Sequence, residues 1–176
     1  MIQKILFLDI DGVLNYMPDR ESLQILKNNL GNEKFQHEIY GFSERLVKYL
    51  KMIIDATDCK IVFSTTWRCF KDHHIEGSDW RKTLAELLNV DQSIFIGNTP
   101  DITSGWDNGS FSRRRGSEIK MWIDCNTEPG KYKFCVIDDE VVDIIPVLPK
   151  KNVIHTDMRV GLTQDNVDEA IRILNN

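Results

Sequence analysis

Short runs of apolar residues recur along the chain, and polar residues or glycine follow each run. The first run, residues 4–10, is rich in Ile, Leu and Phe and leads into Asp11 and Gly12. An apolar run of this length is typical of a strand that is buried on both faces of a sheet. Similar runs predict further strands at residues 60–63, 93–96, 133–137 and 152–155.

Amphipathic helical patterns lie between these predicted strands. Ser43 is expected to cap a helix over residues 44–55, whose apolar stripe comprises Leu46, Val47, Leu50, Ile53 and Ile54. Residues 80–88 and 116–125 show similar spacing, and Thr163 is expected to cap a last helix with inward-facing Val167, Ala170, Ile171 and Leu174. This alternation predicts a three-layer α/β fold with a mainly parallel central sheet, which binds ligands beyond the carboxyl ends of its strands.

Length and composition indicate one domain. The chain has 176 residues, of which 41% are apolar and 28% charged, so it is long enough to bury a core of its own. We expect residues 1–176 to form a single domain with a small insertion at about 15–42. This stretch and residues 97–114 look irregular and follow predicted strand ends, where they can form a small lid or rim over a site.

Charge and apolar patterning exclude several classes of protein. The net charge of −5 gives no overall attraction to nucleic acid or to an anionic membrane. The N-terminal apolar run is too short for a membrane span and lacks a signal-peptide cleavage region, which favours a cytoplasmic protein. The four cysteines form no CxxC pair, so we expect reduced thiols and no zinc ribbon. The sequence also lacks the GxxxxGK[ST] and GxGxxG nucleotide-binding motifs.

Two carboxylates, Asp9 and Asp11, stand at the end of the first predicted strand, just before Gly12. Residues two apart on a strand point the same way, and the turn after the strand can place both side chains around one small site. Covalent hydrolysis of a phosphate ester needs such a pair. One ionised carboxylate attacks, and a second carboxyl group protonates the leaving oxygen and later activates water. Because Asp and Gly are common turn residues, a plain turn explains the isolated pattern equally well.

Further polar residues end two other predicted strands. Asp138 and Asp139 follow the fourth strand, and Asp143 lies four residues beyond Asp139. Carboxylates gathered at strand ends repel one another unless a hard cation compensates them, and Mg²⁺ prefers carboxylate and phosphate oxygens. Ser64 and Thr65 follow the second strand, with hydroxyls that can donate to phosphate oxygens or cap the next helix. The sequence thus predicts a magnesium and phosphate site at this edge of the sheet.

Segments of the chain resemble, in the same order, the four motifs of the haloacid dehalogenase (HAD) superfamily of phosphohydrolases: FLDIDGVLN, FSTTWR, an Arg just before a predicted helix, and VIDDE. The match spans nearly the whole chain. A narrower resemblance links it to HAD domains found with RNA-repair proteins and in phages, related to polynucleotide 3′-phosphatases, through STTWR, GNTPDI, RRGSEIKMWI, VIDDE and HTDMRVGLT. The resemblance implies a Rossmann-like fold with a minimal cap insertion and a Mg²⁺-dependent phosphomonoester hydrolase.

The resemblance also implies roles for individual residues. Asp9 matches the nucleophile that becomes a phosphoaspartate and also binds Mg²⁺. Asp11 matches the general acid and base, whose backbone carbonyl reaches the metal. Asp138 and Asp139 match the acidic pair that holds Mg²⁺ directly or through water. Ser64 stands where the second motif places its phosphate-binding hydroxyl, with adjacent Thr65 as the alternative by one residue of register.

The cation of the third motif has two candidates. Arg115 stands just before a predicted helix, whose N-terminus adds its own positive end. Lys120 lies about one turn farther along, where a surface position is expected. Arg68 matches an Arg that grips phosphate in the related polynucleotide phosphatases, or it forms an ion pair on a helix surface. Asp143 matches a more distal acid of some members, or it is a solvated helix residue.

The expected partner is a phosphorylated substrate, with a nucleotide or polynucleotide end as the leading class and a small phosphorylated metabolite as the alternative. A third hypothesis is a catalytically idle binding module, which the four motif aspartates count against. The arginines at 113–115 can hold a polynucleotide backbone or form a solvated loop, and Trp106 can contact a leaving group. His73 and His74 lack partners at metal-ligand spacing, which disfavours a second metal centre.

Overall fold

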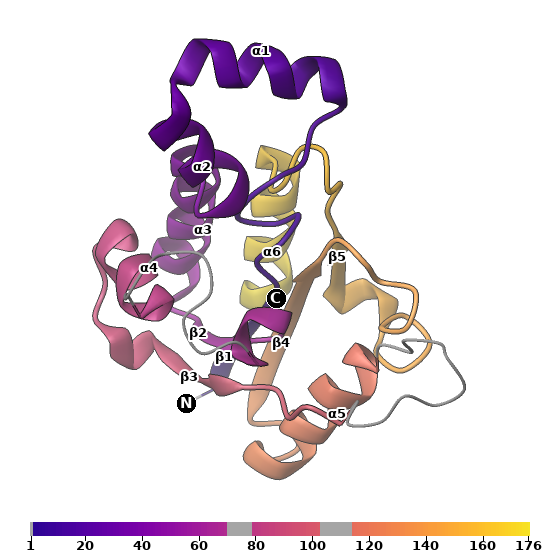
Figure 1. Ribbon diagram of the computed structural model, residues 1–176. Coiled ribbons are helices and arrows are strands. Elements are labelled where there is room, and N and C mark those ends of the chain that lie inside the picture. Colours follow the sequence, from indigo (N-terminus) through magenta and orange to yellow (C-terminus); the bar gives the residue numbers. More distant parts are fainter. Residues whose placement is uncertain (1, 70–78, 103–113) are drawn as a thin grey trace.

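The computed structural model describes residues 2–69, 79–102 and 114–176. Its five-stranded sheet is parallel throughout, with the strand order β3-β2-β1-β4-β5 (Figure 1). The strands are β1 Gln3–Leu8, β2 Lys60–Phe63, β3 Phe95–Asn98, β4 Tyr132–Asp138 and β5 Val153–His155. The predicted α/β fold with a parallel central sheet is therefore confirmed.

Two strands differ from the prediction at their ends. β1 stops at Leu8, because the carbonyl of Ile10 already accepts hydrogen bonds from the amides of Val13 and Leu14 in a turn. β3 begins only at Phe95, because Gln92–Ile94 form a short 3₁₀ helix. Both differences lie where an apolar run crosses the boundary between a strand and a turn, after β1 and before β3, and hydrophobicity alone does not mark that boundary.

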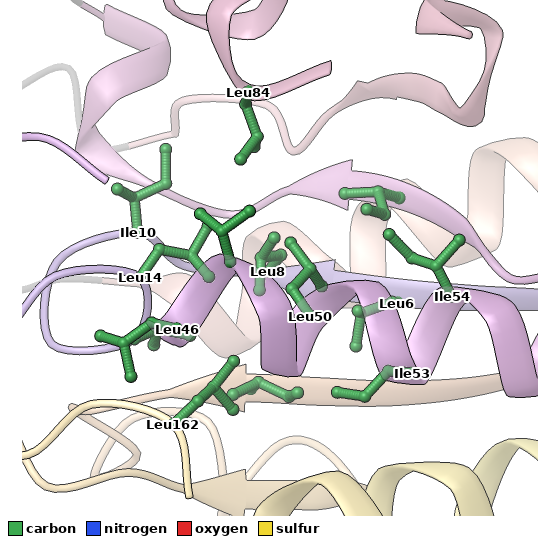
Figure 2. Close-up of a cluster of buried hydrophobic side chains, with 14 of the residues drawn as sticks. Leu6, Leu8, Ile10, Leu14, Leu46, Leu50, Ile53, Ile54, Leu84 and Leu162 are labelled. Atoms are coloured by element: carbon green, nitrogen blue, oxygen red, sulfur yellow. The ribbon is translucent and has the colours of Figure 1, made fainter. Parts of the chain in front are cut away.

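Helices cover both faces of the sheet. They include α3 Glu44–Thr57, α4 Trp80–Leu88, α5 Arg115–Asn126 and α6 Gln164–Asn175. Because side chains alternate along a strand, Leu6 and Leu8 of β1 join a core cluster with α3, α4 and α6, whereas Ile5 and Phe7 pack with α5 on the other face. Figure 2 shows the first cluster, in which the α3 stripe meets β1. The stripe predicted for α3 is confirmed, since all five of its apolar residues are buried.

The two predicted helix caps differ in their contacts. Thr163 forms a capping box with Asn166 at the start of α6, as expected of a Thr at this position. Ser43 precedes α3 as predicted, yet its hydroxyl makes no capping hydrogen bond and instead donates to Oε1 of Glu38 at 2.6 Å. This contact ties the insertion to the body of the protein.

The insertion at 15–42 is helical, so the prediction of an irregular stretch was wrong. It contains α1 Arg20–Leu30 and α2 Asn32–Tyr40. α1 begins after Asp19, whose carboxylate accepts from two backbone amides, and it has no fully buried residue. α2 buries Phe35 and Ile39. Figure 1 shows α1 beyond α2, at the end of the molecule farthest from the sheet.

The three central strands, β2, β1 and β4, end at the same level of the sheet. Past the strand ends, the amide of Asp9 donates to the carbonyl of Ile137, and the amide of Ser64 donates to the carbonyl of Leu8. The residues that follow β1, β2 and β4 therefore share one edge of the sheet. Among the described residues, no helix has the length and hydropathy that a membrane crossing requires.

Candidate active site

Asp9 lies at the centre of this edge, directly after the middle strand. Its side chain is buried, and Oδ1 accepts a hydrogen bond from the amide of Ile10 at 2.8 Å. Burial raises the pKa of the Asp9 carboxyl, and the opposing effect of the Arg115 guanidinium only partly offsets that rise. A hydrogen bond with the Thr65 side chain also favours the ionised form.

Three carboxylates gather around this point. Asp9, Asp138 and Asp139 each offer an oxygen, and these oxygens lie within 4.8 Å of one another. Asp138 is 1% exposed, and its Oδ1 accepts from the amide of Glu140, but its Oδ2 has no hydrogen-bond partner among the described residues. Such a cluster is costly unless positive charge compensates it.

The electrostatics of the cluster are visible in its pKa values. Burial and the Asp9 carboxylate raise the pKa of Asp138 well above its usual range. The same two causes raise the pKa of Asp139 to about 6. The protein on its own therefore leaves negative charge undercompensated here, as expected of a site that is completed by a cation.

Gly12 allows the chain to turn tightly beside this cluster. Its φ of +67° is in the left-handed region, and a Cβ at this position would lie 2.7 Å from the side chain of Asp139. Its carbonyl accepts a hydrogen bond from the hydroxyl of Thr156 at 2.8 Å. The glycine of the first motif thus provides room for an acid of the fourth.

Arg115 is the cation in contact with the carboxylates. Its Nη1 lies 3.1 Å from Oδ1 of Asp9 and 3.3 Å from Oδ2 of Asp138, and it also donates to the carbonyl of Ser64. Burial works against the charged form, but the two carboxylates prevail and raise the pKa of Arg115. Lys120, the competing candidate, instead pairs with exposed Asp124 at 2.7 Å. The structure therefore places Arg115, and not Lys120, among the acids.

Asp143 fixes the start of α5, from which Arg115 projects. Its Oδ2 accepts a hydrogen bond from the amide of Arg115 at 2.6 Å, so it serves one of the unpaired amides at the helix N-terminus. Gly116 permits this close approach, because a Cβ there would lie 2.5 Å from the carbonyl oxygen of Asp143. Asp143 is thus neither one of the clustered acids nor a freely solvated residue.

The two hydroxyl candidates after β2 are both fully buried. The carbonyl of Ser64 accepts a hydrogen bond from Arg115, and the Ser64 Oγ has no hydrogen-bond partner among the described residues. Thr65 contacts Asp9 and accepts from the amide of Trp67 at 3.3 Å. The structure therefore brings the Thr65 side chain to Asp9, whereas Ser64 reaches the site through its carbonyl, and neither hydroxyl belongs to the lining of the pocket described below.

Arg68 does not line the pocket at the site. Its Nη2 lies 2.6 Å from Oε2 of Glu118, and its Nη1 donates to the carbonyl of Thr65 at 2.8 Å. Both charged side chains are almost completely buried, so this is an internal ion pair and not the surface pair considered from sequence. It joins the segment after β2 to α5, close to the residues that hold Arg115.

Asp11 faces the pocket and is held at both carboxylate oxygens. Asn15 Nδ2 donates to Oδ1 at 2.9 Å, and Trp67 Nε1 donates to Oδ2 at 2.9 Å. Sequence reasoning missed both donors. The separation of four residues between Asp11 and Asn15 was available as a signal, whereas no local pattern links Asp11 to Trp67 across 56 positions.

A pocket of about 360 Å³ opens above these groups. Asp9, Asp11, Arg115 and Asp139 line its polar side. Its other walls come mostly from the segment after β1, from α2 and from the chain beyond β5, and include Tyr16, Met17, Ile39, Tyr40 and Met158. The insertion therefore contributes one wall of the pocket, as the prediction of a small rim expected.

Two other tryptophans lie away from this pocket: Trp80 and Trp122 are buried in the two core clusters, on opposite faces of the sheet. Trp106, Arg113, His73 and His74 lie outside the described residues.

Comparison with known families adds one finding. A family model described as "HAD domain in Swiss Army Knife RNA repair proteins" matches residues 5–167, nearly the whole chain. No curated protein and no solved structure matches the chain significantly.

Proposed function

Since the chain belongs to the family of HAD domains in Swiss Army Knife RNA repair proteins, we propose that it is a Mg²⁺-dependent phosphomonoester hydrolase that works through a phosphoaspartate. One observation carries the proposal. The buried Asp9 carboxylate lies between Arg115 and the acids after β4, while Asp11 faces the same pocket. This arrangement supplies a nucleophile, a proton donor and charge compensation together.

The carboxylate cluster fits a hard divalent cation. Its ligand atoms are all oxygens, and the buried Oδ2 of Asp138 lacks a hydrogen-bond donor among the described residues. Asp9, Asp138 and Asp139 would hold the ion, with the backbone carbonyl of Asp11 as a further ligand. When bound, Mg²⁺ supplies positive charge that offsets the carboxylates and the phosphate dianion.

The first chemical step belongs to Asp9 and Asp11. An oxygen of the Asp9 carboxylate attacks phosphorus, and the bond from phosphorus to the ester oxygen breaks. The leaving oxygen keeps the electron pair and takes the proton of the Asp11 carboxyl, so that the alcohol departs neutral. Arg115, which lines the pocket beside Asp9, would orient the phosphoryl oxygens and stabilise their charge.

The second step releases phosphate. Asp11, now ionised, takes a proton from water, and the water oxygen attacks the phosphorus of the phosphoaspartate. The bond between phosphorus and the Asp9 oxygen breaks, which regenerates the Asp9 carboxylate and leaves Asp11 protonated. The internal ion pair between Arg68 and Glu118 joins the segment after β2 to α5, and neither residue belongs to the lining of the pocket.

For the substrate, we propose a nucleotide or polynucleotide end. The family's association with RNA repair supports this class. The pocket supports it as well, because Met17, Tyr40 and Met158 offer apolar and aromatic surface beside the charged groups. A small hydrophilic metabolite phosphate would leave that surface unused, and it remains the second candidate.

The test is phosphate release with Mg²⁺ from a panel of 3′-phosphorylated oligonucleotide, mononucleotides and sugar phosphates. We expect the wild type to release phosphate and Asp9→Asn to release none. Asp55→Asn is the matched control, because Asp55 is an exposed acid that pairs with Lys51 on α3. No release by folded, Mg²⁺-bound wild type would favour the idle binding module, and preference for a sugar phosphate would favour the metabolite candidate.

A further inference from the structure

The carboxylate of Asp11 is clamped from two directions. The indole Nε1 of Trp67 donates to one oxygen and the amide Nδ2 of Asn15 to the other, each at 2.9 Å. Trp67 follows β2 and Asn15 follows β1, so the clamp closes across the edge of the sheet. The two side chains, which come from different segments of the chain, thus donate to the same carboxylate.

Both donors are themselves fixed. Trp67 is 6% exposed and belongs to a short 3₁₀ helix, Thr66–Cys69. Its ring lies 5.5 Å from that of Phe42 and 5.9 Å from that of Trp80, centroid to centroid. Asn15 is 5% exposed, and its Oδ1 accepts from the amide of Gly12 at 3.0 Å. A rigid aromatic cluster on one side and a tight turn on the other therefore hold the clamp.

The clamp leaves Asp11 able to move a proton. A carboxylate has about four lone-pair positions, and these two hydrogen bonds occupy two of them. The indole N–H is a donor only, so it cannot take the proton that Asp11 carries. Asp11 can therefore bind and release a proton on the side that faces the pocket while its carboxyl plane stays fixed.

We propose that Trp67 is a positioning residue, which holds the carboxyl of Asp11 at the leaving oxygen of the substrate. This inference rests on the proposed function and assigns Trp67 a task within it. Proton transfer from a general acid depends on its placement within hydrogen-bond reach of the leaving oxygen. Loss of the indole N–H would free the carboxyl to rotate without removing it.

Leaving groups of different basicity separate this role from ordinary packing. An alkoxide is a poor leaving group and needs the proton of Asp11, whereas p-nitrophenolate departs without much help. A misplaced Asp11 should therefore slow alkyl phosphates selectively. A general loosening of the site should slow both kinds of substrate alike.

The experiment compares kcat/KM for an alkyl phosphate and for p-nitrophenyl phosphate. Trp67→Phe keeps an aromatic ring but removes the N–H, and we expect a loss of at least about tenfold for the alkyl phosphate and of less than about threefold for the aryl phosphate. Asp11→Asn should show the same selectivity with a larger loss. Trp80→Phe is the control, because it alters the same aromatic cluster without touching Asp11, and it should keep the wild-type ratio between substrates.

The outcomes are distinguishable. Equal losses with both substrates in Trp67→Phe, or no loss, would overturn the role of Trp67 while Asp9→Asn remained inactive and the proposed function stood. Turnover by Asp9→Asn would remove the proposed function and this inference with it. If Trp67→Phe does not fold, Asn15→Ala removes the other donor, and the same selectivity is expected of it.

Discussion

Replacing Asp138 by Asn should stabilise the metal-free protein while it destroys metal binding. Asp138 is buried among the carboxylates, and Asn keeps its shape and the oxygen that accepts from the amide of Glu140. The substitution removes a negative charge that the chain alone does not compensate. Acidic sites that bind a cation often lower the stability of the metal-free protein, because their function requires the uncompensated charge.

The magnitude follows from the distances. The oxygens of Asp9 and Asp139 lie within 4.8 Å of that of Asp138, and at an effective dielectric constant near 20 each ionised pair costs about 3.5 kcal/mol. Attraction to Arg115 Nη1 at 3.3 Å returns about 5 kcal/mol. With all three carboxylates ionised, the net relief on neutralising Asp138 is about 2 kcal/mol, and the raised pKa of Asp138 makes this an upper bound. It corresponds to a rise in Tm of at most about 4–8 °C for a domain of this size.

The assay is thermal unfolding at about pH 8, where most carboxyl groups are ionised. It is carried out once in EDTA and once in Mg²⁺. We expect Asp138→Asn to melt above the wild type in EDTA and to gain nothing from Mg²⁺, whereas the wild type gains. Asp124→Asn is the control, since Asp124 is exposed and pairs with Lys120. The Tm of this variant should stay within about 2 °C of the wild type. A lower Tm for Asp138→Asn in EDTA would refute the reasoning that the cluster is undercompensated.

Three other predictions concern the same site. Gly12→Ala should weaken Mg²⁺ binding at least about tenfold in calorimetric titration, because its Cβ would lie 2.7 Å from the Asp139 side chain; unchanged affinity would contradict this. In the absence of metal, the Tm of the wild type should fall relative to that of Asp139→Asn as the pH rises from about 5 to 7. The pKa of Asp139 is raised to about 6, so the folded state keeps a proton that the unfolded chain has released, and a gain in Tm would have the wrong sign. Arg115→Ala should lower kcat/KM at least about 100-fold, whereas Lys120→Ala should stay within about twofold; the reverse order would restore Lys120 as the cation.

Some parts of the fold could be predicted because their signals are local. The strands β2, β4 and β5 and the stripe of α3 follow from apolar spacing over a few residues. The insertion was missed although local signals for α1 were present: Leu23, Leu26 and Leu30 recur at helical spacing and Asp19 stands at the N-cap. α1 is mostly polar and buries no residue completely, so its helical pattern does not mark a core element.

The candidate site likewise contains residues that could be predicted from local sequence and contacts that could not. Asp9, Asp138 and Asp139 were predictable because parallel strands bring their carboxyl ends to one edge, so acids that follow strands meet there. Three other features depend on contacts between distant segments: the pairing of Arg68 with Glu118, the use of Asp143 to hold the start of α5, and the hydrogen bond from Trp67 to Asp11. No local pattern encodes them.

The sequence alone determined the alternation of strands and helices, the edge at which chemistry is expected and the acids that stand there. It did so because strand burial and helical periodicity are short-range properties of the chain. Only the tertiary structure decided which cation meets the acids, which side chains hold Asp11 and which wall the insertion builds. Those outcomes depend on the direction and packing of side chains that are far apart in sequence, and these are fixed only when the whole core has formed.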